Sequence, residues 1–183
     1  MVALPQEENC GRYIKESTHM QPAHAALLGT TLGGSALLGA SYVAARPSAS
    51  DWGRVPAIYH TPMLVSAALA VLALVGVLLY FSMLGGDRRM TWVLVGAAVG
   101  FFALQLAFLP LVRAALRGAV PRWTVTALLA ATVVPTLVVA YVAITSTTPS
   151  ATRQWVRAVV VLASLFAALH TIVMDAVLFG ILF

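Results

Sequence analysis

Apolar residues form five long, nearly uninterrupted blocks along this chain, separated by short polar segments. The blocks cover residues 25–44, 62–84, 91–112, 123–144 and 154–183. An α-helix rises about 1.5 Å per residue, so about 20 apolar residues cross the ~30 Å hydrocarbon core of a bilayer. Continuous rather than alternating apolar runs favour helices over a β-barrel. The pattern predicts an all-α membrane protein, a bundle of five transmembrane helices within residues 24–183.

The first 23 residues have a different character from the rest of the chain. They carry Glu7, Glu8, Arg12, Lys15 and Glu16 and contain no apolar run. This composition is unlike that of a secretory signal peptide, and the acidic residues argue against a mitochondrial presequence. We expect residues 1–23 to be a polar segment that lies on the membrane surface or against a partner.

Composition and charge narrow the class of protein further. Hydrophobic residues make up 61% of the chain and charged residues 9%, against about 25% charged residues in soluble domains. The net charge of +5 comes from basic residues outside the apolar blocks or at their ends. In so apolar a chain these indicate contact with anionic lipid headgroups rather than nucleic acid. If the five spans alternate, the basic residues divide almost evenly between the two sides, so the charge does not predict an orientation.

Two of the apolar blocks contain glycines at helical spacing. Gly29 and Gly33, with the adjacent Gly34, lie in the first block, and Gly96 and Gly100 repeat the four-residue spacing in the third. Small residues at this spacing let a second helix approach closely in a membrane. We expect these glycines to form packing faces, either within the bundle or toward another subunit. A pore lining is the alternative.

Few polar side chains fall within the apolar blocks. The notable ones are Gln105, His170, Thr171 and Asp175. An ionisable group inside a membrane is costly and is therefore a functional candidate. His170 and Asp175 are five residues apart, or about 140° around an α-helix, so we expect them not to pair, whereas Thr171 and Asp175 share a face. A structural hydrogen bond or partner contact is expected for Asp175, with a proton or ion path as the alternative.

Motifs for catalysis or cofactor binding are missing from the sequence. There is no nucleophile elbow, no glycine-rich phosphate loop and no cluster of carboxylates or histidines. His24 and His60 begin successive antiparallel spans and His170 lies near the middle of another, so no two of these histidines match in depth as haem ligation requires. We therefore expect no catalytic residue, no metal and no intrinsic cofactor, and we expect bound phospholipid.

A succession of short motifs runs from residue 42 to residue 105. An arginine follows the first span, an Asp-Trp pair lies in the loop, a polar-Thr pair and a Leu/Ser cluster open the second span, a Gly-Asp-Arg turn follows, and glycine precedes glutamine in the third. These are Arg46, Asp51-Trp52, His60-Thr61, Leu64, Ser66, Gly86-Asp87-Arg88, Gly100 and Gln105. The succession resembles the early part of the five-helix form of cytochrome c oxidase subunit III.

The remainder of the chain follows this family only in part. The closing helix of the family carries a histidine and an aspartate, which His170 and Asp175 resemble with altered spacing. Phe108 lies near the place of an acidic residue of the family, and the fourth span lacks the family's histidines. A polar lead containing Cys10, a glycine-rich first span and a later GxxxG are also similar to the four-span Tim family of mitochondrial inner-membrane translocase subunits and its complex I relative.

Both resemblances imply a membrane subunit without catalytic residues of its own. We expect a non-catalytic accessory subunit of a respiratory complex, which carries out electron transfer and proton translocation. Its partners would be the other membrane subunits and lipids. Its location would be the mitochondrial inner membrane or the bacterial plasma membrane. The alternative is an autonomous small channel or transporter.

Overall fold

The computed structural model describes residues 21–53, 55–84, 87–146 and 154–179. Five helices in this part are long and apolar enough to cross a membrane, which confirms the predicted all-α bundle. The elements are α2 (Pro22–Ala45), the short 3-10 helix η1 (Ala49–Trp52), α3 (Ala57–Leu84), α4 (Arg88–Leu116), α5 (Trp123–Thr145), α6 (Gln154–His170) and the π-helix η3 (Thr171–Phe179), which continues α6.

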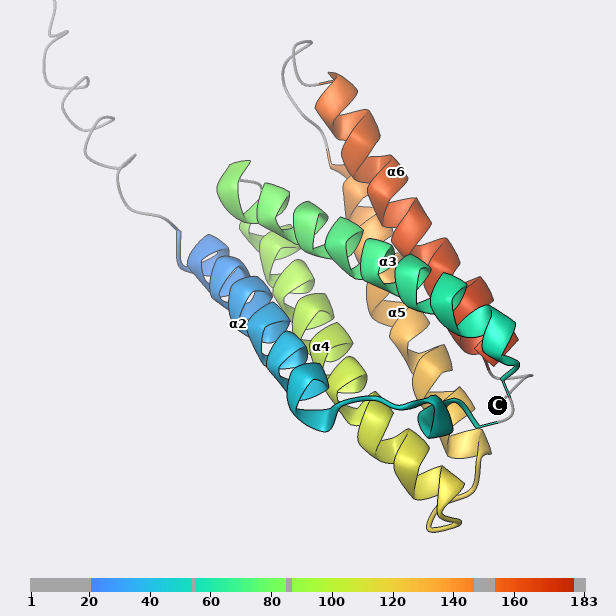
Figure 1. The fold of residues 1–183 in the computed structure, drawn as a ribbon. Helices are drawn as coiled ribbons and strands as arrows, with labels where there is room; N and C mark the ends of the chain where they lie inside the picture. Colours follow the sequence, from blue (N-terminus) through green and yellow to red (C-terminus); the bar gives the residue numbers. More distant parts are fainter. Residues whose placement is uncertain (1–20, 54, 85–86, 147–153, 180–183) are drawn as a thin grey trace, which may run out of the picture.

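The helices form a closed ring whose order differs from their order in the sequence. α2 packs against α4, α4 against α5, α5 against α6, α6 against α3, and α3 against α2. Successive helices run in opposite directions, so the beginning of α2 and the end of η3 lie at opposite ends of the bundle (Figure 1). Every helix therefore turns one face toward a common interior.

Two groups of buried apolar side chains hold the ring together. The larger group joins all five helices, and it includes Leu27, Leu74, Leu78, Leu94, Phe101, Phe102, Val139 and Val160. The smaller group includes Val55, Met63, Val112, Val125, Leu129 and Phe179. Branched aliphatic side chains that interdigitate in this way supply the van der Waals contacts that drive helix association in lipid.

The predicted glycine faces meet different surroundings. A Cβ atom added at Gly34 would overlap the buried ring of Phe102 on α4, so Gly34 permits the close contact between α2 and α4. A Cβ atom added at Gly29, Gly33, Gly96 or Gly100 would have no atom of the described chain within 4 Å. The packing role of these four glycines stays a prediction that concerns a surface outside the bundle.

The helix ends differ modestly from the predicted boundaries. α2 begins at Pro22, because a proline in the first turn loses no helical hydrogen bond. It ends at Ala45, and the capping residue Arg46 that follows adopts the left-handed conformation (φ 46°). α4 continues through Pro110 to Leu116. The predicted surface segment of residues 1–23 lies outside the described residues up to residue 20, as does Gly86 of the Gly-Asp-Arg turn.

Candidate functional site

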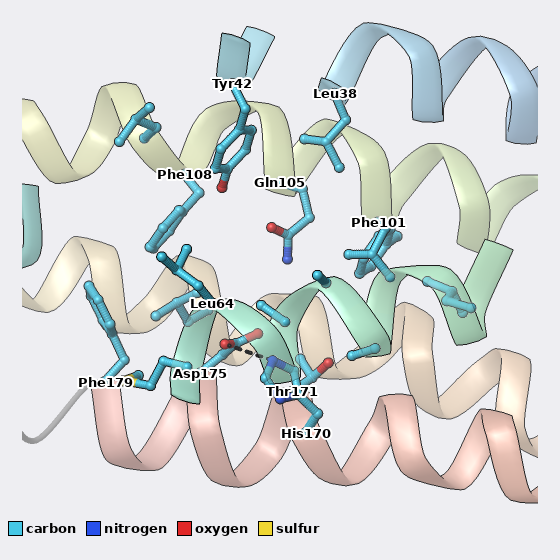
Figure 2. Close-up of a pocket in the computed structure, with 18 of the residues that line it drawn as sticks. Leu38, Tyr42, Leu64, Phe101, Gln105, Phe108, His170, Thr171, Asp175 and Phe179 are labelled. Atoms are coloured by element: carbon cyan, nitrogen blue, oxygen red, sulfur yellow. Dashed lines mark ion pairs between the residues drawn. The ribbon is translucent and has the colours of Figure 1, made fainter. Parts of the chain in front are cut away.

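The interior of the ring contains a cavity of about 610 Å³. All five helices and η1 contribute to its walls (Figure 2). The walls are mostly apolar, and the lining side chains include Leu38, Leu64, Leu72, Phe101, Leu109, Leu129 and Ala167. A cavity of this size and character is typical of a small-molecule site, which ordinarily contains a few polar groups that orient a ligand.

Four of the lining residues carry prominent polar groups, and they come from separate parts of the ring. Tyr42 extends from α2, Gln105 from α4, and His170 and Asp175 from the last helix. Figure 2 shows the Tyr42 hydroxyl and the Gln105 amide directed into the cavity, with the His170–Asp175 pair on the facing wall. The predicted intramembrane polar residues therefore meet in one place, together with a tyrosine.

His170 and Asp175 form a pair, so the prediction that they do not share a face is wrong. His170 Nε2 lies 3.4 Å from Asp175 Oδ1. The prediction assumed α-helical geometry, but the chain is π-helical from Thr171 to Phe179. A π-helix bonds residue i to residue i+5, which brings residues five apart to the same face. Isolated π-turns are rare and occur frequently at functional sites.

The side chain of His170 is buried, and its ring nitrogens form no hydrogen bond with the described residues around it. It is 4% exposed, and neither ring nitrogen has a hydrogen-bond partner among the described residues, because the Asp175 contact lacks hydrogen-bond geometry. Buried polar atoms in proteins nearly always have such a partner. An unpartnered imidazole at the cavity wall is therefore a feature that calls for a ligand or for a function.

The Thr171 hydroxyl does not bond to Asp175, although the sequence placed the two residues on one helix face. The hydroxyl donates to the carbonyl oxygen of Ala167 at 2.9 Å. Thr171 is buried where the π-helix begins, and its hydroxyl satisfies a carbonyl of the last α-helical turn. Thr31 and Ser164 make the same bond to the carbonyl four residues back within α2 and α6, so the recorded bond ties Thr171 to the last turn of α6 rather than to Asp175.

Aromatic side chains close the end of the cavity nearest to η1. The Trp52 indole stacks on the His60 ring with the centroids 4.5 Å apart, and His60 Nε2 lies 2.9 Å from the Val55 carbonyl oxygen. Phe179 contacts both Trp52 and Phe108, at centroid distances of 6.3 and 5.5 Å. The loop between α2 and α3 is therefore packed onto the end of the bundle rather than extended from it.

Arg113 ties this loop to α4. Its Nε and Nη2 atoms donate to the two carboxylate oxygens of Asp51 at 2.9 and 3.0 Å, and Nη2 also donates to the carbonyl oxygen of Ala45 at 2.8 Å. The bidentate hydrogen bond from Arg113 is the main reason that the pKa of Asp51 lies below its ordinary value. One guanidinium thus connects the end of α2, η1 and α4.

The described residues contain no group of three or more His, Cys, Asp or Glu side chains that could hold a metal ion. His24 lies on α2 at the end of the bundle away from η1, where its Nε2 is 3.5 Å from the Thr91 hydroxyl. The expectation of no intrinsic cofactor is not tested by this arrangement. The polar groups at the cavity, which come from Tyr42, Gln105, His170 and Asp175, supply hydrogen-bonding atoms and one carboxylate rather than the several ligands that a metal ion needs.

Sequence reasoning did not identify several residues of the site. Tyr42 and Phe108 were not expected to line a cavity, although Phe101, Gln105 and Phe108 follow one another at the spacing of one helix face. The Asp51–Arg113 bond joins residues 62 positions apart. A charge pair at such a separation leaves no local pattern in the sequence. The one indication is that the loop after α2 and the end of α4 lie on the same side of the predicted bundle.

Comparison with protein families, curated proteins and solved structures finds no match to this chain.

Proposed function

We propose that this multi-pass membrane protein is a non-catalytic accessory subunit of a respiratory complex, which packs against the core subunits and lipids. The observation that carries the proposal is a face of small residues on α2 that its own bundle leaves uncovered. The five membrane-crossing helices account for the membrane location, and the uncovered face accounts for the need of a partner.

The α2 face consists of exposed small residues spaced three or four positions apart along the helix: Ala25, Gly29, Gly33, Ala36 and Ala40. Leu32 and Leu37 flank this face and are exposed as well. The α2 face forms a shallow groove between two leucines, which allows another helix backbone to come close. In a membrane, where lipid tails are as apolar as leucine, such contacts are the usual basis of helix association.

The respiratory assignment is supported by where the residues of the subunit III resemblance lie. Trp52, Leu64 and Gln105, together with His170 and Asp175 of the closing helix, all line the same cavity. Part of the resemblance is thus gathered at one cavity, whereas Arg46, Thr61, Ser66 and Gly100 of the same set do not line it. On this proposal the protein resides in the mitochondrial inner membrane or the bacterial plasma membrane and carries phospholipid on its apolar surface.

Purification in a mild detergent tests the proposal. The tagged full-length chain is isolated from its native membrane, and native-gel bands are identified by mass spectrometry. We expect subunits of a respiratory complex to co-purify. Gly33→Leu fills the α2 face and is expected to reduce co-purification at least about tenfold while the chain itself still folds, since no atom of the bundle lies near Gly33.

Ala131→Leu is the matched control, because Ala131 is an exposed small residue of α5, a helix that does not pack against α2 in the ring. This variant should co-purify like the parent. The alternative function, an autonomous channel or transporter, predicts a chain that runs alone in the native gel and conducts in liposomes. That result, or a Gly33→Leu variant that assembles normally, would contradict the accessory role.

A further inference from the structure

We propose that the cavity is a binding site for an amphipathic organic cation, with an amine or quaternary ammonium head at Asp175 and an apolar body along the helix walls. The accessory role in a complex does not require such a site. The inference stands on the charges, the aromatic side chains and the opening of the cavity.

The charge balance of the cavity favours a positive ligand. Asp175 is 22% exposed, and its contact with His170 lacks hydrogen-bond geometry. None of the described residues that line the cavity is Lys or Arg, and the second lining carboxylate, Asp51, is neutralised by Arg113. Asp175 is therefore an acidic side chain of the lining with no Lys or Arg among the described lining residues, and its carboxylate places a negative charge in apolar surroundings. Such a charge is costly unless a cation compensates it.

The neighbouring polar groups suit the head of such a ligand. The buried imidazole of His170 lacks a partner, and in its neutral form it provides one acceptor and one donor. The Gln105 amide oxygen and the Tyr42 hydroxyl face the same space (Figure 2) and can accept hydrogen bonds from an ammonium group. A single cationic head would therefore satisfy groups from three helices.

The walls suit an apolar body that carries a positive charge. Tyr42, Phe101, Phe108 and Phe179 line the cavity, and Trp52 closes one end. A cation near an aromatic face is stabilised by the ring quadrupole, most strongly where water is excluded. An anion of the same shape gains nothing from these faces and is repelled by Asp175.

The opening of the cavity indicates where the ligand comes from. Gly39 on α2 and Leu64 and Leu72 on α3 line the cavity and are exposed, the two leucines by 53% and 66%. The cavity is thus open at the side of the bundle between the second half of α2 and the stretch of α3 from Leu64 to Leu72, where exposed apolar side chains would meet lipid. A ligand that enters there must be soluble in the hydrocarbon region.

Tetraphenylphosphonium and tetraphenylborate, which share one shape and differ in the sign of the charge, test the proposal. Binding of radiolabelled tetraphenylphosphonium to the purified full-length chain in detergent is measured against protein-free micelles. We expect saturable binding of tetraphenylphosphonium and, in a separate sample, no saturable binding of radiolabelled tetraphenylborate. Asp175→Asn, which keeps the side-chain shape, should weaken binding by at least about tenfold, since one partner of a desolvated charge pair is lost.

Phe108→Leu keeps the charge and removes one aromatic face, so it should weaken binding several-fold. Thermal unfolding of each variant in detergent verifies that it is folded. Unsaturable binding of tetraphenylphosphonium, equally tight binding of tetraphenylborate measured separately, or a folded Asp175→Asn variant with unchanged affinity would overturn the proposal. The accessory role is judged by co-purification alone, so failure of one proposal is distinct from failure of the other.

Discussion

Two single residues, Arg113 and Gly34, each determine how separate parts of the chain pack together. Arg113 donates to both oxygens of Asp51 and to the Ala45 carbonyl, so one side chain fixes the end of α2 and the approach to α3. At the α2–α4 contact, the absence of a side chain at Gly34 makes room for Phe102. Both examples concern pairs from distant parts of the chain, so the sequence around each residue does not indicate them.

The first prediction concerns Asp51. Its pKa is lowered in the folded protein, so its contribution to stability is fully present above the unfolded pKa of about 3.9 and is lost as the pH falls through the folded pKa. We expect Asp51→Asn to lower the free energy of unfolding by up to about 1 kcal/mol at neutral pH, because the Arg113 side chain is 35% exposed and solvent screens the pair. Thermal unfolding in detergent should show this difference to be constant above about pH 5 and to shrink below about pH 4.

Arg113→Lys is the companion variant, because lysine keeps the charge and loses the planar fork that contacts both carboxylate oxygens. It should fall between the parent and Asp51→Asn in stability at neutral pH. A destabilisation by Asp51→Asn that is the same at pH 3 and pH 7 would mean that the carboxylate charge is not what stabilises the loop.

At the scale of elements, the change from α6 to the π-helix η3 decides the chemistry of the site. In an uninterrupted α-helix His170 and Asp175 would point in different directions. The π-turns bring them to 3.4 Å, and the back-bonded hydroxyl of Thr171 lies where the geometry changes. The apolar pattern of this segment is compatible with either helix type, so the sequence does not distinguish them.

Thr171→Val tests this element. It removes the hydroxyl that donates to Ala167 with little change in shape, and we expect a loss of about 1 kcal/mol in stability and a several-fold weaker affinity for tetraphenylphosphonium, because Asp175 is no longer held toward the cavity. Ser164→Ala is the control, since the Ser164 hydroxyl makes an equivalent buried bond to Val160 at 2.7 Å within regular α6. If both variants weaken binding equally, the π-geometry is not specifically required.

At the scale of the whole molecule, the described residues form five antiparallel helices that are long and apolar enough to cross a membrane, and this number predicts the topology. The start of α2 and the end of η3 lie at opposite ends of the bundle (Figure 1). Reporter fusions at Met1 and at Phe183 should therefore fall on opposite sides of the membrane. Fusions to alkaline phosphatase and to green fluorescent protein in bacteria report the side on which each end lies. Reporters at the two ends that are active in the same compartment would contradict the five-span arrangement.

The sequence by itself determined the class of protein and the number of membrane-crossing helices. Each apolar block is long enough to match the bilayer thickness, and the need to satisfy backbone groups in lipid turns such a block into a helix regardless of its neighbours. The polar residues Gln105, His170 and Asp175 were also evident as candidates, because an ionisable or amide group inside an apolar block is costly wherever it points.

Only the tertiary structure decided which of these polar groups lie close together and that they line a cavity. The ring order, which places α4 between α2 and α5 and α3 between α2 and α6, depends on how the side chains of distant helices fit, and five apolar helices of similar pattern leave that order open. The same packing brings Tyr42 opposite Asp175 and leaves the α2 face uncovered. Hydrophobicity selects the membrane as the environment, whereas the complementary shapes of the helices determine the cavity within it.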